Sequence, residues 1–220
     1  MNAPQDHLSG EAKVPAGGRR GRPSAETTRR RMAYLLDVAR GMFVRQGYRA
    51  TTMDEVAAAA GVTKRTLYAW HADKQALFQA CVIAGAERFP KLAPDAGGDL
   101  RSGLERYVFD LHDELSRADS YGMGLLAAGE AREFPEMREA ILRGHLDYMI
   151  EPLAVFLRGH GLEEDGALER TMLFVAMALS PLHNAMLVGL PLPTPGQVRD
   201  HARRCVGIFL GDPASCRASA

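Results

Sequence analysis

The sequence predicts an all-α protein that combines an N-terminal three-helix helix-turn-helix domain with a larger C-terminal helical domain. Three observations favour this fold class. Apolar residues recur at spacings of three and four along most of the chain, which is the helical period. Glycine, proline and capping residues divide the chain into segments of helical length. No run of alternating β-branched residues flanked by turn signals is present, so no sheet is expected.

Composition divides the chain into three parts. Residues 1–24 are rich in Pro, Gly and Ala and end in a basic cluster, so we expect a disordered basic arm. Residues 25–80 are expected to form the helix-turn-helix domain, and residues 81–220 the second domain. Residues 1–80 hold 13 Lys and Arg against 7 Asp and Glu, a net charge of +6, whereas the remainder carries −6. This asymmetry suggests that only the front of the chain meets a polyanion, although chance unevenness would look the same.

Capping residues place the N-terminal helices. Helices are expected at about 27–46, 53–60, from 64 onward, and 74–89. Thr52, Thr63 and Asp73 each precede one of them, where a side-chain oxygen can accept from the first backbone N–H groups. Gly47 and Gly61 end the first two helices.

The segment TMDEVAAAAGVTKRTLYAWH, residues 52–71, contains two short helices joined by a tight turn. The second helix begins with the polar side chains that a recognition helix needs to reach base edges in the major groove. An ordered set of residues around it resembles the DNA-binding domain of the TetR family: Ala39, Phe43, Gly47-Tyr48, Thr51-Thr52, Glu55-Val56-Ala57, Ala60-Gly61-Val62, Thr66-Leu67-Tyr68, Lys74 and Ala76-Leu77-Phe78.

The resemblance implies a role for each residue of the expected DNA surface. Bases and flanking phosphates would be contacted by Thr63, Lys64, Arg65 and Thr66. Phosphates or the sugar-phosphate backbone would be contacted by Thr52, Tyr68, Trp70 and Lys74. Two alternatives stay open, because Trp70 could instead pack in the core and Arg65 could simply be solvated.

One position departs from the family pattern. The family usually has an aromatic residue, most often Phe, packed in the domain core where this chain has His71. His71 either packs there as a neutral imidazole or turns outward to a phosphate. A second candidate DNA contact is the arm, in which Arg19, Arg20 and Arg22 could enter an adjacent minor groove or remain a solvated charge cluster.

The C-terminal part is expected to contain helices at roughly 100–117, 120–131, 135–159, 164–190 and 195–210. Gly129-Glu130-Ala131 and Phe134-Pro135-Glu136 resemble the C-terminal domain of the AefR-like branch of the same family. The wider family uses this domain to bind small, mostly apolar molecules and to dimerise, so the resemblance implies a ligand-binding and dimerisation domain.

Eight residues are candidates for an apolar ligand pocket: Tyr107, Leu111, Met123, Tyr148, Met149, Phe174, Met177 and His183. The alternative for each apolar member is ordinary core packing. His112, His145, His183 and Asn184 are polar residues near apolar stretches, and each could orient a ligand or be a surface or satisfied core residue.

The segment from Leu168 to Leu190 is nearly apolar on all sides, so it needs cover on its outer face as well as its inner one. A second copy of the chain is the natural cover, which predicts a homodimer through residues 164–190 and 195–210. Two recognition helices about 34 Å apart, or a multiple of that, would then read a roughly palindromic operator.

Together these features predict a cytoplasmic transcriptional regulator, most often a repressor in this family, that leaves double-stranded operator DNA when a small apolar effector binds. The alternatives are an architectural DNA-binding protein without a ligand and a small enzyme. An enzyme is disfavoured because neither Ser180 with His183 nor Cys205 with His201 has an orienting acid or an oxyanion motif. No cofactor, metal spacing, signal peptide or uninterrupted membrane-length apolar run is evident.

Overall fold

The computed structural model describes residues 25–92, 99–130, 133, 135–162 and 167–212. Within these ranges every regular element is a helix, which confirms the predicted all-α fold class. The α-helices are α1 (Ala25–Ala50), α2 (Met53–Ala59), α3 (Lys64–Trp70), α4 (Lys74–Ala86), α5 (Leu100–Ser116), α6 (Ala118–Glu130), α7 (Pro135–His145), α8 (Glu151–Gly159), α9 (Ala167–Val188) and α10 (Pro195–Phe209). A π-helical turn, η1 (Leu146–Ile150), joins α7 to α8, so the long helix expected over 135–159 is continuous but locally rewound.

The three predicted N-terminal caps are present. Thr52 forms a capping box with Glu55 at the start of α2, and Thr63 accepts a hydrogen bond from the backbone of the first turn of α3. Asp73 does the same for α4. Gly47 interrupts α1 with φ 83°, a left-handed conformation that glycine adopts without the steric cost of a side chain.

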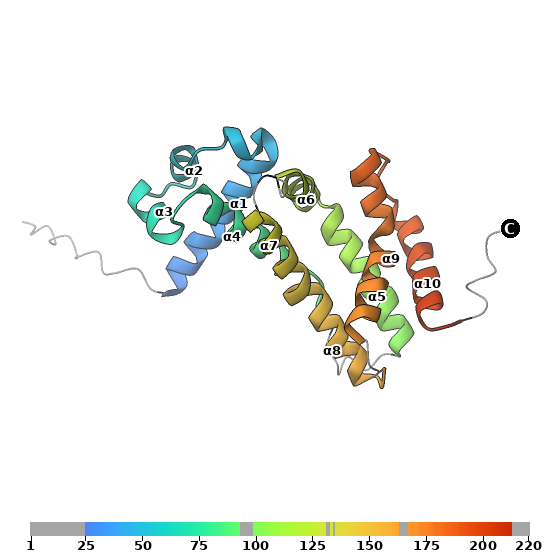
Figure 1. Ribbon diagram of the computed structural model, residues 1–220. Helices are drawn as coiled ribbons and strands as arrows, with labels where there is room; N and C mark the ends of the chain where they lie inside the picture. The colour runs from blue at the N-terminus through green and yellow to red at the C-terminus, as the bar shows by residue number, and fades with distance from the viewer. Residues whose placement is uncertain (1–24, 93–98, 131–132, 134, 163–166, 213–220) are drawn as a thin grey trace, which may run out of the picture.

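The helices are arranged along an elongated body (Figure 1). Helices α1 to α4 lie at one end, α9 and α10 lie at the other, and α6 and α7 lie between them. Helix α4 packs against both α1 and α7, and α1 packs against α6. Because α4 runs across residue 80, the boundary expected there falls within a helix that contacts both parts of the molecule.

The hydrophobic core of the N-terminal end is shared with the C-terminal domain. Phe43, Tyr48 and Phe78 form its aromatic centre, with ring centroids 5.1 to 5.8 Å apart. The same cluster includes Met123 of α6 and Met137 of α7. The N-terminal end is therefore packed directly onto α6 and α7 and is not a separate unit joined by a linker.

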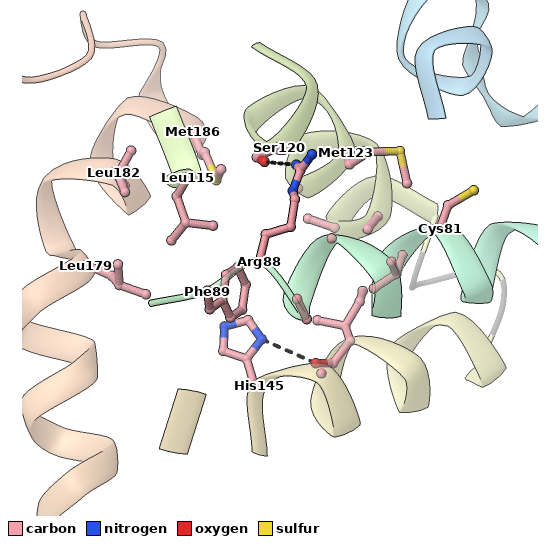
Figure 2. Close-up of a pocket in the computed structure, with 18 of the residues that line it drawn as sticks. Cys81, Arg88, Phe89, Leu115, Ser120, Met123, His145, Leu179, Leu182 and Met186 are labelled. Atoms are coloured by element: carbon pink, nitrogen blue, oxygen red, sulfur yellow. Dashed lines mark hydrogen bonds between the residues drawn. The ribbon is translucent and has the colours of Figure 1, made fainter. Parts of the chain in front are cut away.

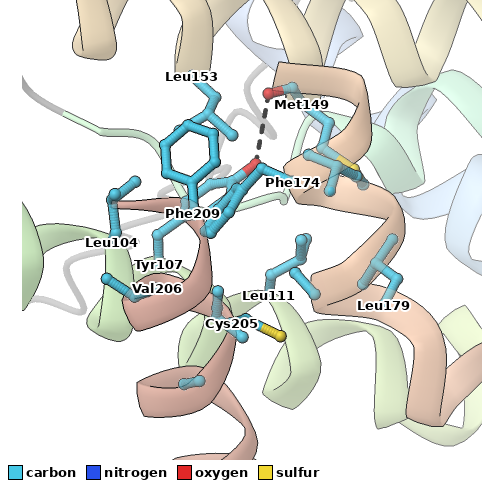
Figure 3. Close-up of a cluster of buried hydrophobic side chains, with 14 of the residues drawn as sticks. Leu104, Tyr107, Leu111, Met149, Leu153, Phe174, Leu179, Cys205, Val206 and Phe209 are labelled. Carbon is cyan, nitrogen blue, oxygen red and sulfur yellow. Dashed lines mark hydrogen bonds between the residues drawn. The ribbon is translucent and has the colours of Figure 1, made fainter. Parts of the chain in front are cut away.

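A second core cluster joins α5, η1, α8, α9 and α10 (Figure 3). Phe174 of α9 packs on Phe209 of α10, with ring centroids 4.7 Å apart. The hydroxyl of Tyr107 donates to the carbonyl of Met149 in the π-helical turn, over 3.3 Å.

Two histidines satisfy carbonyl groups around a proline in α9. Pro181 has no N–H, so the carbonyl of Met177 loses its normal helical partner. His201 Nε2 lies 3.0 Å from that oxygen, and His112 Nε2 lies 2.7 Å from the oxygen of Ala178. His112 is a buried core histidine whose Nε2 is bonded to a backbone carbonyl, while its Nδ1 has no hydrogen-bond partner among the described residues.

Candidate DNA-binding surface and ligand cavity

The turn between α2 and α3 is built by one glycine and two buried apolar residues. Gly61 has φ 64°, and the next residue, Val62, donates its N–H to the carbonyl of Ala57 over 3.0 Å. Val56 of α2 and Leu67 of α3 are fully buried in the N-terminal core. A helix as short as α3 is unstable alone, so its orientation is fixed by Leu67 and by the Thr63 cap.

The opposite face of α3 is open to solvent. Thr63, Lys64 and Arg65 at its N-terminal end are exposed, Thr66 is half-buried, and Tyr68 one turn later is 49 % exposed. Lys64 pairs with the exposed Asp54 of α2. Exposed ion pairs contribute little to stability, so this lysine can exchange the carboxylate for a phosphate at low cost.

Thr52 uses its hydroxyl within its own capping box. The oxygen accepts from the N–H of Glu55 over 3.2 Å, and the hydroxyl donates to the Glu55 carboxylate over 2.8 Å. The side chain remains exposed next to the open N-terminal turn of α2.

Trp70, His71 and Lys74 lie differently from the exposed residues of α3. Trp70 is half-buried and packs against the N-terminal core. His71 is buried, and burial lowers the pKa of its imidazole, so the ring packs inward in neutral form. Of the two orientations considered for His71, the structure has the inward one, and we remove this residue from the expected phosphate contacts.

The ammonium group of Lys74 is engaged within the protein. It donates to the carbonyls of Tyr48 and Arg49 over 2.9 and 3.2 Å and lies 4.5 Å from the centre of the Tyr48 ring. These contacts fasten the start of α4 to the end of α1 and use two of the three donors of the ammonium group, so the contact of Lys74 with a phosphate stays a prediction. Arg19, Arg20 and Arg22 lie outside the described residues.

A cavity of about 290 Å³ lies between α4, α6, α7 and α9 (Figure 2). Its wall is mostly apolar and is contributed by both halves of the chain. The lining residues are Arg40, Cys81, Val82, Gly85, Ala86, Arg88, Phe89, Leu115, Ser120, Met123, Gly124, Ala127, Ala128, Ile141, Gly144, His145, Leu179, Leu182, His183 and Met186.

Two of the eight pocket candidates, Met123 and His183, line this cavity. The other six do not. Five belong to the second core cluster or pack against it, namely Tyr107, Leu111, Met149, Phe174 and Met177. Tyr148 points elsewhere and donates to Glu87 over 3.3 Å.

A pocket between the fourth helix and the C-terminal helices was expected, but the residues of α4 that line the cavity were not among the eight candidates. These residues are Cys81, Val82, Gly85 and Ala86. His145 was noted only as one polar residue near an apolar stretch.

The charged groups at one side of the cavity neutralise one another. Asp119 accepts from Arg40 of α1 over 2.9 Å and from Arg88 over 3.0 Å. Arg88 also pairs with Glu114 over 2.9 Å and donates to Ser120 over 2.7 Å. Burial opposes ionisation of Asp119, but the hydrogen bonds and charges of the two arginines hold the pKa of its carboxyl below the ordinary value. This network connects α1, the end of α4, α5 and α6.

Helix α9 also exposes large apolar side chains to solvent. Its large exposed residues are Leu168, Met172, Leu173, Leu187 and Val188, the first three near one end and the last two near the other. Leu168–Val188 is long and apolar enough to cross a membrane by length and composition alone, although Glu169 and Arg170 interrupt its apolar run. One such helix is weak evidence for a membrane span, because a core helix of a soluble protein passes the same test.

Comparison with known proteins identifies the N-terminal end. Residues 35–81 match the family model described as bacterial regulatory proteins, tetR family. The HTH-type transcriptional activator FasR of Mycolicibacterium smegmatis is 33% identical over 112 residues, which are 47% of this chain and 50% of FasR. The match thus spans about half the length of that relative.

Solved structures extend the likeness to the whole fold. A putative TetR-family transcriptional regulator from Mesorhizobium loti has a TM-score of 0.72 at 22% identity, with 84% of this chain and 96% of that chain covered. The Flavonoid-responsive Regulator FrrA has a TM-score of 0.62 at 26% identity, covering 83% and 96%. The likeness to the Mesorhizobium protein shows a shared fold, and the AefR-like branch stays a prediction.

Proposed function

The chain belongs to the TetR family of bacterial regulatory proteins, and from this premise we propose that it is a homodimeric, ligand-responsive repressor acting in the cytoplasm. In this proposal the N-terminal end of α3 reads a palindromic operator. A small, mostly apolar molecule fills the cavity behind α4 and releases the DNA.

The observation that carries the DNA-binding part is the exposure of one polar helix end on a buried support. Lys64 and Arg65 are exposed, whereas Leu67 on the same short helix is fully buried. Lysine and arginine side chains can donate to guanine O6 and N7 in the major groove. Tyr68 is exposed one turn further along and can donate its hydroxyl to a phosphate.

Triple replacement of Lys64, Arg65 and Tyr68 by alanine tests this assignment. The operator is first selected from random duplex DNA, and its half-site spacing shows whether two reading helices bind. Each lost contact costs about 1–3 kcal/mol, so the triple variant should bind at least about 100-fold more weakly. A matched control replaces the exposed Arg106 and Arg158, which lie on α5 and α8, and should bind like the parent. Parental affinity of the triple variant would overturn the assignment, and unselective binding would favour an architectural protein.

The homodimer is supported by the apolar outer face of α9. Monomeric soluble proteins rarely expose several large apolar side chains on one helix. Leu173 is 62 % exposed and Leu187 is 82 % exposed. A second copy of the same face would remove both from water and bring two α3 helices to one side of the assembly.

The effector response is supported by the position of the cavity. Its wall includes Cys81 and Val82 of α4 and Arg40 of α1, so an occupant would touch helices that carry the DNA-binding end. A ligand changes operator affinity only if it binds one conformation better than the other, and about 1.4 kcal/mol of preference gives a tenfold change. The neighbour FrrA is described as flavonoid-responsive, which is in keeping with a small-molecule effector here.

The sign of regulation is tested by deleting the gene and measuring transcription from a promoter that carries the selected operator. Repression predicts that transcription rises on deletion. The relative FasR is named an activator, so a fall in transcription on deletion would replace the repressor assignment by that of an activator.

A further inference from the structure

One polar group inside the cavity has an unused hydrogen-bonding position. His145 is the last residue of α7, and its Nδ1 lies 3.2 Å from the carbonyl oxygen of Ile141. A carbonyl only accepts, so Nδ1 carries the hydrogen of this bond. No residue in the described ranges forms a hydrogen bond with Nε2. Figure 2 shows the ring below Phe89, with its second nitrogen turned away from the bonded carbonyl.

The ring is neutral, which determines what Nε2 can do. Burial lowers the pKa of His145, and the nearby His183 lowers it further, against a smaller opposing effect of the Ile141 hydrogen bond. With the hydrogen on Nδ1, a neutral imidazole presents Nε2 as a bare acceptor.

The other charged groups of the wall are already paired with opposite charges. Arg40 and Arg88 form ion pairs with Asp119 and Glu114, although Nε of the buried Arg40 has no hydrogen-bond partner among the described residues. A charged ligand would lose its hydration and meet no unpaired counter-charge, which is costly in a mostly apolar space.

We propose that the cavity takes a neutral, mostly apolar molecule with one hydroxyl group, as in a phenol, and that this hydroxyl donates to Nε2 of His145. The inference rests on the proposed function of the cavity as the effector site, and it names the chemical class that the site selects.

The selectivity follows from the cost of leaving an acceptor buried without a donor. A methyl ether of the same shape fills the cavity but cannot donate, so Nε2 would lose water and gain nothing. Such unsatisfied groups cost about 1–3 kcal/mol, which corresponds to binding weakened by a factor of about 5 to about 140.

The test is calorimetric titration of the full chain, without DNA, with three matched series of probes. These are 4-alkylphenols with chains of two to eight carbons, the corresponding 4-alkylanisoles and the corresponding 4-alkylbenzoates. At neutral pH the best phenol should bind at least about fivefold more tightly than its anisole, and the benzoates should bind most weakly.

Three variants separate a specific role of His145 from a general effect on packing. His145→Leu should bring the phenol and its anisole to within about threefold of each other, and His145→Gln should partly restore the difference because its amide oxygen accepts. His160→Leu is the matched control. His160 Nδ1 lies 3.0 Å from the carbonyl of Phe156, four residues earlier as in His145, yet it does not line the cavity. Melting temperatures check that each variant folds.

Several outcomes would overturn the inference: no binding by any phenol of the series, equal binding of phenol and anisole, tightest binding of a benzoate, or an unchanged ratio in His145→Leu. Failure of the regulatory proposal would look different. The phenol preference would be present and dependent on His145, but saturating phenol would leave operator affinity unchanged.

Discussion

Helices α3 and α9 both present a face to solvent, but the two faces have opposite chemistry. Helix α3 has seven residues and exposes Thr63, Lys64 and Arg65 over a single buried leucine. Helix α9 has 22 residues and exposes large apolar side chains such as Leu173 and Leu187. The short helix depends on its neighbours for stability, whereas the long one has more apolar surface than its own chain covers.

This difference indicates two kinds of partner at opposite ends of one body. An exposed cationic helix end gains most from a polyanion, whose phosphates and base edges accept hydrogen bonds. An exposed apolar helix gains most from another apolar surface. The shared core through Met123 and Met137 connects the two ends, so a structural change at one end can be transmitted to the other.

The largest expected effect is on dimerisation through the exposed apolar side chains of α9. Leu173→Glu would place a carboxylate in the proposed interface of α9 in both copies, so the dimer should dissociate at least about 100-fold more readily. Analytical ultracentrifugation over a concentration series measures this. Leu142→Glu is the control, because Leu142 is similarly exposed, at 56 % against 62 %, but lies on α7. Equal dimerisation of both variants and the parent would remove α9 from the interface.

A smaller effect is expected where α1 meets α6. A Cβ atom on Gly122 would lie 2.6 Å from Cγ1 of Val44, so in Gly122→Ala either the Val44 side chain or the packing of α1 on α6 must shift. We expect a loss of about 1–3 kcal/mol in the free energy of unfolding, measured in urea. Gly129→Ala in the same helix meets nothing within 4 Å and should be neutral or stabilising by up to about 1 kcal/mol. If the two variants were equally stable, the close contact between the two ends would not exist in solution.

The smallest effect is expected from acidification, and it tests the buried histidines of both ends. Burial lowers the pKa values of His71 at one end and of His112 and His145 at the other below the ordinary 6.5. Below about pH 6.5 the unfolded chain therefore binds more protons than the folded one. Stability should be fully present above that pH and should fall as the pH decreases toward the lowered values.

Urea unfolding at a fixed protein concentration at pH 7.5 and 5.5 measures this change. His112→Leu should reduce the difference between the two pH values, because one buried imidazole is removed. His183→Gln should reduce it only slightly, because the exposed His183 is the smallest of the causes that lower the pKa values of His112 and His145. A stability that rises on acidification would contradict the assignment of neutral buried rings.

The helix caps and the glycine turns of the DNA-binding end could be predicted from the sequence. Thr52, Thr63 and Asp73 cap the helices that they were expected to cap, because a cap is made by a side chain and the backbone three residues later. Gly47 and Gly61 take positive φ angles, which glycine adopts readily because it has no Cβ atom. The exposed face of α3 followed from the same local pattern.

Individual side chains with long-range partners were less predictable. Lys74 was expected to contact a phosphate, and the structure adds two carbonyl partners some 25 residues earlier in the chain. His71 had two possible orientations, and the choice depended on whether the packed helices leave room for its ring. Neither outcome can be obtained from spacing along the chain.

The amino-acid sequence by itself determined the helices, their caps, the two glycine breaks and the polar end of α3, because these depend on residues within one or two turns of each other. Only the tertiary structure decided that Tyr107 and Leu111 pack in a filled core while His145 borders an empty space. Helical periodicity indicates which side chains turn inward, but the volume left between helices depends on how distant segments pack.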